Sequence, residues 1–306
     1  MHNIDIKSRL AVRRNDATLG AVIKGIDLSK SLHETEILDV LVALGRYGVL
    51  RFPAQRLTAA QLKAVAEKFG TVQMPERGST HRADNVPEVS ILSNTIQDGV
   101  NTGMANGRGI WHTDVSHREV RGFANLSYAL KVPRRNGHAL GATNFANMYK
   151  AYEDLSEEIK SRIEGATAVH SPEQYYLRRQ GYKEVRASLS EVHRKTSQNI
   201  SQPLVLVHPV SRRKVLYANP GFTTRINGWS EEESTAMLSF LFQHQTRQEY
   251  QYTHQWEEND LLIWDNLSTI HRTNTDYQPH EQQVMYRCRV LADRFYSERL
   301  LSTYSV

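Results

Sequence analysis

The run Gln283-Val-Met-Tyr-Arg-Cys-Arg-Val-Leu291 has the composition of a β-strand, with β-branched and aromatic residues along most of its length. Shorter runs of this kind, each bounded by turn residues, are Ser90–Ser93, Ala124–Leu130, Leu204–His208, Lys214–Ala218 and Asp260–Trp264. Many short strands spread over a long chain are typical of an antiparallel barrel or jelly roll. We therefore expect a mostly β fold.

Helical patterns lie between these runs. Leu32 to Glu36 open a helix whose apolar positions, from Ile37 to Leu44, recur at helical spacing, and Thr58 suits the N-cap of a second helix that Gly70 stops. Two further helical stretches cover about residues 147–155 and a segment that begins at Ser230. We expect these helices to pack outside the strands.

Length and composition indicate one globular unit. The chain has 306 residues, of which 40% are hydrophobic and 23% charged, and it contains no repeat or linker, so we expect a single domain over residues 1–306. Residues 95–109 are rich in Gly, Asn and Thr, which predicts a lid over a site. Residues 172–202 are polar and read as an insertion.

Charge and cysteine content narrow the partners and the compartment. The N-terminus lacks a secretory signal, no apolar run is long enough to cross a membrane, and Cys288 is the single cysteine, so we expect a cytoplasmic protein without a membrane partner. Lys and Arg number 38 against 33 Asp and Glu, and the basic doublets are dispersed. This pattern favours a small anionic substrate over a nucleic acid.

The segment Trp111-His112-Thr113-Asp114 carries the candidate chemistry. In a strand, residues two apart point to the same face, so His112 and Asp114 can converge on one ion. Two histidines and one carboxylate are the facial ligand set of non-haem iron oxygenases. Of the 13 histidines, His271 is the best second candidate, since it follows a strand that ends in a turn. A His-X-Asp pair alone also fits a polar surface strand.

The chain resembles the taurine dioxygenase and aryloxyalkanoate dioxygenase family of iron and 2-oxoglutarate enzymes nearly end to end. The shared segments are Gly20–Leu28, Gly48–Gln55, Phe69-Gly70, Trp111–Ser116, Leu140–Phe145, Tyr217–Ile226 and Trp264–Arg272. They occur in the family's order and approximate spacing. The resemblance implies a double-stranded β-helix in which His112, Asp114 and His271 hold Fe(II), with 2-oxoglutarate and dioxygen as co-substrates.

The resemblance also implies how 2-oxoglutarate is held. Thr143 matches the family threonine that helps to bind the distal carboxylate; its alternative is a structural strand residue. The family arginine that forms the main salt bridge to that carboxylate is missing, because positions 282 and 283 are both glutamine. Arg287 and Arg289 follow on one strand face, and Arg287 matches a second family arginine. Either Arg287 has taken over the anchor, with Arg289 as the alternative, or the co-substrate differs.

The remaining histidines have weaker readings. His81 precedes the glycine-rich segment where substrate-contacting residues of the family occur, so it is a weak substrate-site candidate. We expect surface or structural roles for His138, His170, His193, His208, His244, His254 and His280. Trp264, Tyr217, Asn219 and Trp256 are expected to pack or to close turns.

The implied reaction is hydroxylation of a small substrate with release of succinate and carbon dioxide. Desaturation, cyclisation or epimerisation remain open, while Asp114 argues against a halogenase. A second class is a non-catalytic metal-binding or ligand-sensing β-barrel, which the glutamines at 282 and 283 favour. A hydrolase lacks a nucleophile motif such as Gly-X-Ser-X-Gly. Family members are usually homo-oligomers.

Overall fold

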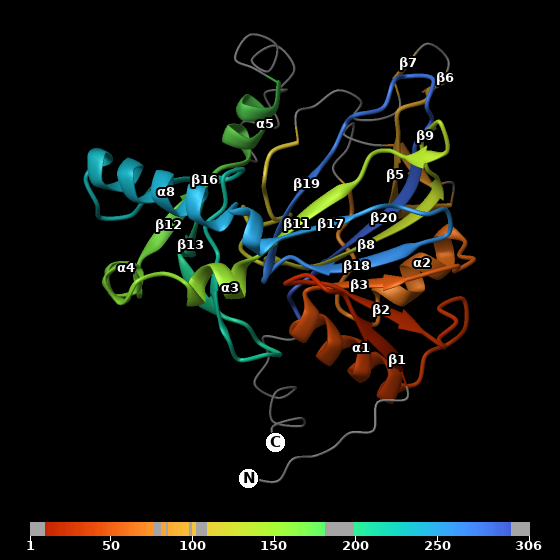
Figure 1. Ribbon diagram of the computed structural model, residues 1–306, viewed down its shortest axis with the longest axis horizontal. Helices are drawn as coiled ribbons and strands as arrows, with labels where there is room; N and C mark the ends of the chain where they lie inside the picture. Colours follow the sequence, from red (N-terminus) through yellow and green to blue (C-terminus); the bar gives the residue numbers. More distant parts are fainter. Residues whose placement is uncertain are drawn as a thin grey trace.

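A computed structural model describes residues 10–75, 81–83, 85–97, 100–101, 109–180 and 199–294. Within these ranges the chain is mostly β, with helices packed against the outside of the sheets (Figure 1). This confirms the predicted class. None of the helices in the described ranges is long and apolar enough to span a membrane.

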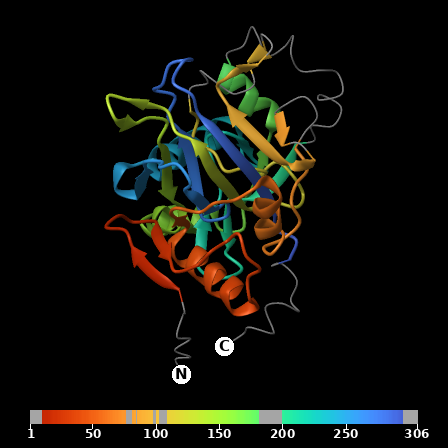
Figure 2. The ribbon, with the colours of Figure 1, turned by 90° about the vertical axis from the view of Figure 1, so that its right-hand side faces the viewer.

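An eight-stranded sheet forms the largest element of the fold. Its strands in spatial order are β1 (Ala11–Arg14), β2 (Ala21–Lys24), β3 (Val49–Phe52), β18 (Leu261–Asp265), β8 (Gly122–Lys131), β20 (Val284–Leu291), β5 (Val86–Ser93) and β4 (His81–Ala83). All neighbours are antiparallel except β2 and β3. Figure 2 shows β5 and β20, in orange and blue, side by side.

Two helices cover one face of this sheet. Helix α1 (Glu34–Tyr47) ends at Gly48, which adopts a left-handed φ of 69° that few other residues tolerate. Helix α2 (Ala59–Ala66) begins at Thr58, whose side chain accepts a hydrogen bond from the Gln61 backbone, as the sequence predicted. Apolar side chains of β8 and β20 that face these helices include Leu126, Tyr128, Cys288 and Val290, all in the main core.

The opposite, inner face of the large sheet packs against a second sheet. This sheet has three antiparallel strands, in the order β17 (Gln251–His254), β11 (Thr143–Asn147) and β19 (Thr269–Thr273). Phe145 of β11 meets Trp264 of β18 edge to face, with ring centroids 5.5 Å apart. The core between the sheets therefore lies directly beside His271, which pairs with Phe145 in register.

The rest of the chain forms a third, smaller unit at the left of Figure 1. A three-stranded sheet orders β13 (Ile200–Pro203), β12 (Thr167–His170) and β16 (Thr223–Ile226). Its neighbours are α3 (Met148–Glu153), α4 (Glu157–Ile163), α5 (Pro172–Gln180), α8 (Glu231–Gln245), the 3-10 turn η1 (Gln248–Tyr250) and the hairpin of β14 (Val205–Val207) and β15 (Lys214–Leu216). Ser230 caps α8 through a reciprocal bond with Glu233, so the predicted helix start is confirmed.

Short ribbons complete the described chain: β6 (Ile96–Gln97) pairs with β7 (Val100–Asn101), and β9 (Arg134–Arg135) with β10 (His138–Ala139). Most of the predicted lid at 95–109, namely residues 98–99 and 102–108, lies outside the described residues. The predicted insertion at 172–202 begins as α5 and ends in β13, while residues 181–198 lie outside the described part.

Candidate metal centre and active site

His112 reaches the site from an irregular segment and not from a regular strand. Its backbone N donates to the His271 carbonyl at 3.0 Å and its carbonyl accepts from the His271 N at 2.7 Å, which forms an isolated bridge. Asp114 already lies in a turn, and Val115 has a φ of 62°. The predicted strand across His112 and Asp114 is therefore wrong, because the chain turns immediately after the bridge.

Asp114 is oriented by a buried amide chain. Asn125 of β8 donates its side-chain N–H to Asp114 Oδ2, and Asn266 donates to Asn125 Oδ1 at 3.1 Å. Thr113 donates its hydroxyl to the Asn266 carbonyl, which ties the same turn to the end of β18. Asn125 and Asn266 are fully buried, so the groups that orient the Asp114 carboxylate cannot rotate into solvent.

His271 is placed by the turn that joins β18 to β19. Asp265 accepts from the Leu267 backbone at 2.8 Å, from the Ser268 hydroxyl at 2.6 Å and lies 2.8 Å from His208 Nε2. His208 Nδ1 accepts backbone N–H groups from residues 210 and 211, so the ring proton is on Nε2, the nitrogen that lies beside Asp265. His208 is structural, as expected, and holds the turn just ahead of His271.

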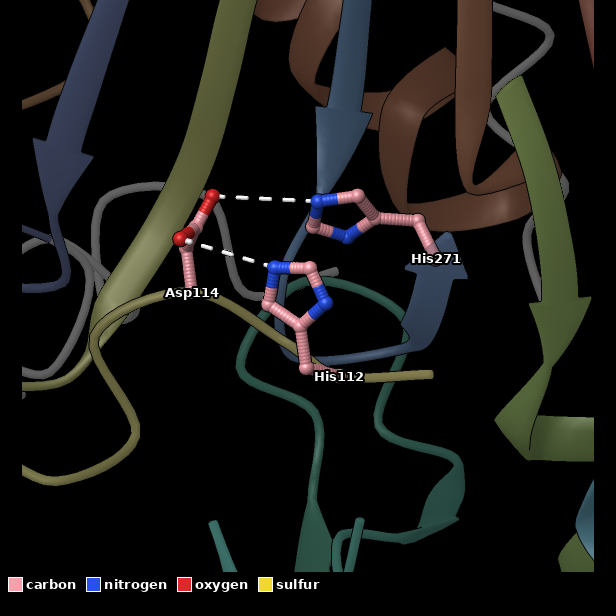
Figure 3. A group of neighbouring side chains, drawn as sticks. All are labelled: His112, Asp114 and His271. Atoms are coloured by element: carbon pink, nitrogen blue, oxygen red, sulfur yellow. Dashed lines mark ion pairs between the residues drawn. The ribbon is translucent and has the colours of Figure 1, made fainter. Parts of the chain in front are cut away.

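The three predicted ligands converge in Figure 3, where their side chains point toward one another. His112 Nε2 lies 4.0 Å from Asp114 Oδ1, and His271 Nε2 lies 3.8 Å from Asp114 Oδ2. One nitrogen or oxygen from each residue fits within 4.8 Å of the others, and no other group of three potential ligands occurs in the described parts of the chain. Sequence reasoning found this cluster from residue types and resemblance.

The protonation of the cluster suits metal binding. Burial lowers the pKa of His271, reinforced by the neighbouring His112, so its imidazole is neutral. Burial alone would raise the pKa of Asp114, but the positive charges of Arg289 and Arg287 outweigh it and hold the pKa well below its usual range. A neutral imidazole and an ionised carboxylate are the forms that donate to a metal.

The donor set also fits a metal through the hydrogen bonds behind it. His112 Nδ1 lies 2.7 Å from the Ile110 carbonyl, which places the proton on Nδ1 and leaves the Nε2 lone pair facing Asp114. Two imidazoles and one carboxylate, of which Asp114 and His271 are buried and His112 is partly buried, match the two-histidine, one-carboxylate arrangement of non-haem Fe(II) sites.

Both candidate arginines lie on the inner face of β20. Arg289 pairs with Asn125 and Arg287 with Ser127 across β8, so both side chains share the face that bears Asp114 and its amide partner. Arg289 Nη2 is 3.4 Å from Asp114 Oδ1. The resemblance alone did not predict this contact between a cation and a proposed metal ligand.

Thr143 lies on the facing sheet, two residues along β11 from Phe145, the partner of His271. It is 5% exposed, and its Oγ1 accepts a hydrogen bond from Trp256 Nε1 at 3.0 Å. Thr143 is therefore near the metal cluster but outside it, at a distance of about 7 Å along the strand from the level of His271.

The two glutamines differ in environment. Gln282 accepts from the Lys131 ammonium at the surface, whereas Gln283 is buried and accepts the Tyr277 hydroxyl at 2.9 Å. Gln283 also packs on Gly141, where a Cβ would come within 2.8 Å of the amide nitrogen. Neither position supplies a cation to the inner face.

An aromatic wall beside His112 was missed. Tyr175 of α5 stacks on Phe222 with ring centroids 4.7 Å apart, and its hydroxyl lies 3.4 Å from His112 Nε2. His117 stacks on the other side of Phe222 at 4.9 Å. Gly221 permits this packing, since a Cβ there would meet that of His112 at 2.6 Å. Phe222 lies in the family segment Tyr217–Ile226, but Tyr175 falls in the polar stretch 172–202 that was predicted to be an insertion.

The other histidines that the structure describes have the surface or structural positions that were expected. His170, His244 and His254 are buried, and each lies within reach of protein oxygen atoms, while His138 and His280 are exposed. His193 lies outside the described residues, and His81 belongs to β4, but its side chain is not described. The weak substrate role of His81 stays a prediction.

The model of the family described as taurine catabolism dioxygenase TauD, TfdA family, matches residues 11–289. The chain belongs to this TauD/TfdA family. The predicted enzyme class is thus confirmed as a 2-oxoglutarate-dependent oxidoreductase, and the predicted set of Fe(II), 2-oxoglutarate and dioxygen is the cofactor set of this family.

Relatives of this TauD/TfdA protein have the names of several different enzymes. It is 32% identical to an alkylsulfatase of Acinetobacter baylyi, covering 90% of this chain and 83% of that protein. It is 28% identical to the alpha-ketoglutarate-dependent 2,4-dichlorophenoxyacetate dioxygenase of Cupriavidus pinatubonensis, covering 82% and 88%. A pentalenolactone F synthase of Streptomyces arenae is 29% identical over 88% and 91% of the two chains.

Solved structures of the family have the same fold. A taurine dioxygenase from Burkholderia xenovorans superposes with a TM-score of 0.74 at 27% identity, covering 93% of this chain and 90% of that one. AAD-2, solved with Mn(II) and N-oxalylglycine, gives a TM-score of 0.73 at 28% identity, covering 94% and 99%.

Proposed function

We propose that His112, Asp114 and His271 hold Fe(II) and that the enzyme oxidises a C–H bond of a small anionic substrate. The convergence of these three side chains, with one potential ligand atom of each within 4.8 Å of the others, is the observation that carries the proposal. A neutral His271 imidazole and the His112 proton on Nδ1 are the forms that suit a metal. The bound iron would supply the activation of dioxygen. In a hydroxylation, one oxygen atom enters succinate and the other the product, with carbon dioxide released from 2-oxoglutarate.

We further propose that Thr143 and Arg287 bind the distal carboxylate of 2-oxoglutarate. Thr143 lies two residues beyond the partner of His271 on one sheet, and Arg287 lies two residues beyond Arg289 on the facing sheet. Two residues of strand span about 7 Å, which suits a dicarboxylate whose other end chelates the metal. Arg289 is already engaged with Asp114, so it is the weaker anchor and instead keeps that carboxylate ionised.

The surroundings of the cluster supply orientation and exclude water. Phe145 and Trp264 flank the His271 ring at 6.1 and 5.1 Å, while Tyr175 and Phe222 flank His112. An apolar wall limits the side reactions of a reactive intermediate with solvent. We assign the substrate to the side of Tyr175, and the net charge of +5 favours an anionic group on it.

The two facing sheets support the double-stranded β-helix that the resemblance implies, and we propose a single domain over the chain. A cytoplasmic location, the absence of nucleic-acid and membrane partners, and a homo-oligomeric state stay predictions.

Substrate-triggered succinate release tests the proposed function. Small sulfonates, aryloxy acids and amino acids would be assayed with Fe(II), 2-oxoglutarate and dioxygen, each beside its neutral ester or amide. We expect at least one acid to accelerate succinate release well above the rate without substrate, and its neutral analogue to do so far less. Equal acceleration by neutral analogues would contradict the anionic substrate; no succinate under any condition would contradict the reaction.

A further inference from the structure

Trp256 donates a hydrogen bond to the Thr143 hydroxyl. Among the described residues, no other side chain is seen to bond to this hydroxyl. Its indole Nε1 lies 3.0 Å from Thr143 Oγ1, and the two residues are 2% and 5% exposed. Trp256 belongs to the core between the two sheets, together with Phe145, Trp264 and Met285. The contact is thus buried within the core between the two sheets.

The chemistry of the two groups fixes the direction of the bond. An indole N–H only donates, whereas a hydroxyl has one proton to donate and lone pairs that accept. Since Trp256 occupies a lone pair of Thr143 Oγ1, the hydroxyl proton is left to point elsewhere. A carboxylate has no proton of its own when ionised, so it binds a threonine only when the hydroxyl serves as donor.

Trp256 itself is held by buried groups behind it. The His254 ring meets the indole edge to face, with centroids 4.7 Å apart. His254 Nε2 lies 3.4 Å from Asp260 Oδ2, and Asp260 forms an ion pair of 2.9 Å with Arg51 Nε. His254 and Asp260 are 2% and 1% exposed. This series runs from Arg51 of β3 through Asp260, which precedes β18, and His254 of β17 to the indole ring, which it packs against on one side.

We propose that Trp256 is a positioning residue that makes Thr143 a hydrogen-bond donor toward the distal carboxylate of 2-oxoglutarate. The proposal rests on the proposed function, because it requires the co-substrate to bind beside Thr143. Trp256 does not touch the co-substrate, and its contribution to binding passes entirely through the threonine hydroxyl.

A double-mutant cycle on co-substrate binding tests this role. Affinity for 2-oxoglutarate would be measured by calorimetry on the Mn(II)-loaded protein without oxygen, for wild type, Trp256→Phe, Thr143→Val and the double variant. We expect Trp256→Phe to weaken binding about tenfold, the usual effect of one hydrogen bond. In the Thr143→Val background, the same substitution is expected to change the affinity less than about twofold.

Three comparisons separate positioning from packing. Thr143→Ser keeps the hydroxyl and should retain both tight binding and sensitivity to Trp256→Phe. Trp229→Phe, which removes an indole that lies over Arg162 away from the site, should bind like wild type. If Trp256→Phe fails to fold, 3-benzothienyl-alanine at position 256 keeps the bicyclic ring and removes only the N–H.

The outcomes distinguish this proposal from the proposed function. If wild type binds no 2-oxoglutarate, the proposed function fails. If wild type binds it but Trp256→Phe and the benzothienyl variant bind equally well, or if the losses in the cycle add, then Trp256 does not position Thr143. A similar loss of affinity for 2-oxoglutarate in Trp229→Phe would also overturn the proposal, since it would show that removal of any indole weakens binding.

Discussion

Asp114→Ala is expected to abolish iron-dependent turnover and to lower metal affinity by more than about a hundredfold, since it removes the only carboxylate of the three-residue cluster. His112→Ala and His271→Ala should have the same result, because each leaves two ligands. Titration with Mn(II), followed by electron paramagnetic resonance, measures the loss directly. The thermal unfolding midpoint, recorded in parallel, should show that each variant is folded.

His138 provides the matched control, since it is an exposed histidine on the β9–β10 ribbon. His138→Ala should bind Mn(II) and turn over like wild type. Wild-type metal affinity in any one of the three variants would remove that residue from the metal centre.

Arg287→Ala is expected to raise the KM for 2-oxoglutarate about 10- to 100-fold, the range for loss of a charge-assisted bond in a dry pocket. Neither glutamine at 282 and 283 can replace the lost charge. Arg287→Lys should restore only part of the affinity, because an ammonium keeps the charge but lacks the planar fork. Steady-state kinetics at saturating iron measure the effect.

Gln282→Ala is the control, because Gln282 lies at the surface just before β20. This variant should leave the KM for 2-oxoglutarate unchanged. Arg289→Ala is expected to act differently from Arg287→Ala, mainly by weakening metal binding, because Arg289 contacts Asp114. A large rise in KM for Arg289→Ala with none for Arg287→Ala would transfer the anchor to Arg289. No change in either would show that the carboxylate is held elsewhere.

The local sequence pattern correctly predicted helix starts, which depend on residues close together in the chain. Thr58 and Ser230 cap their helices as expected, because an N-cap depends on groups only a few residues apart. The failure came at His112 and Asp114, where spacing predicted a strand. Val115 adopts a positive φ and Asp114 begins a turn, yet Asn125 still aims the carboxylate at the histidines.

The contacts of the site that the sequence did not predict join residues that are far apart along the chain. Arg289 meets Asp114, and Trp256 meets Thr143, only because β20 and β17 fold onto other strands. Tyr175 is similar, since α5 places it beside His112 from the polar stretch that was predicted to be an insertion. Residue type suggests such groups can bind or pack; register between sheets decides which partner each one reaches.

Visible absorption without oxygen tests the central claim most directly, since it needs no knowledge of the substrate. Addition of Fe(II) and 2-oxoglutarate to the metal-free protein should produce a charge-transfer band that saturates at one iron per chain and is lost in His112→Ala, Asp114→Ala and His271→Ala. No band in wild type at saturating Fe(II) and 2-oxoglutarate would contradict the assignment of these three residues as an iron centre that binds the co-substrate.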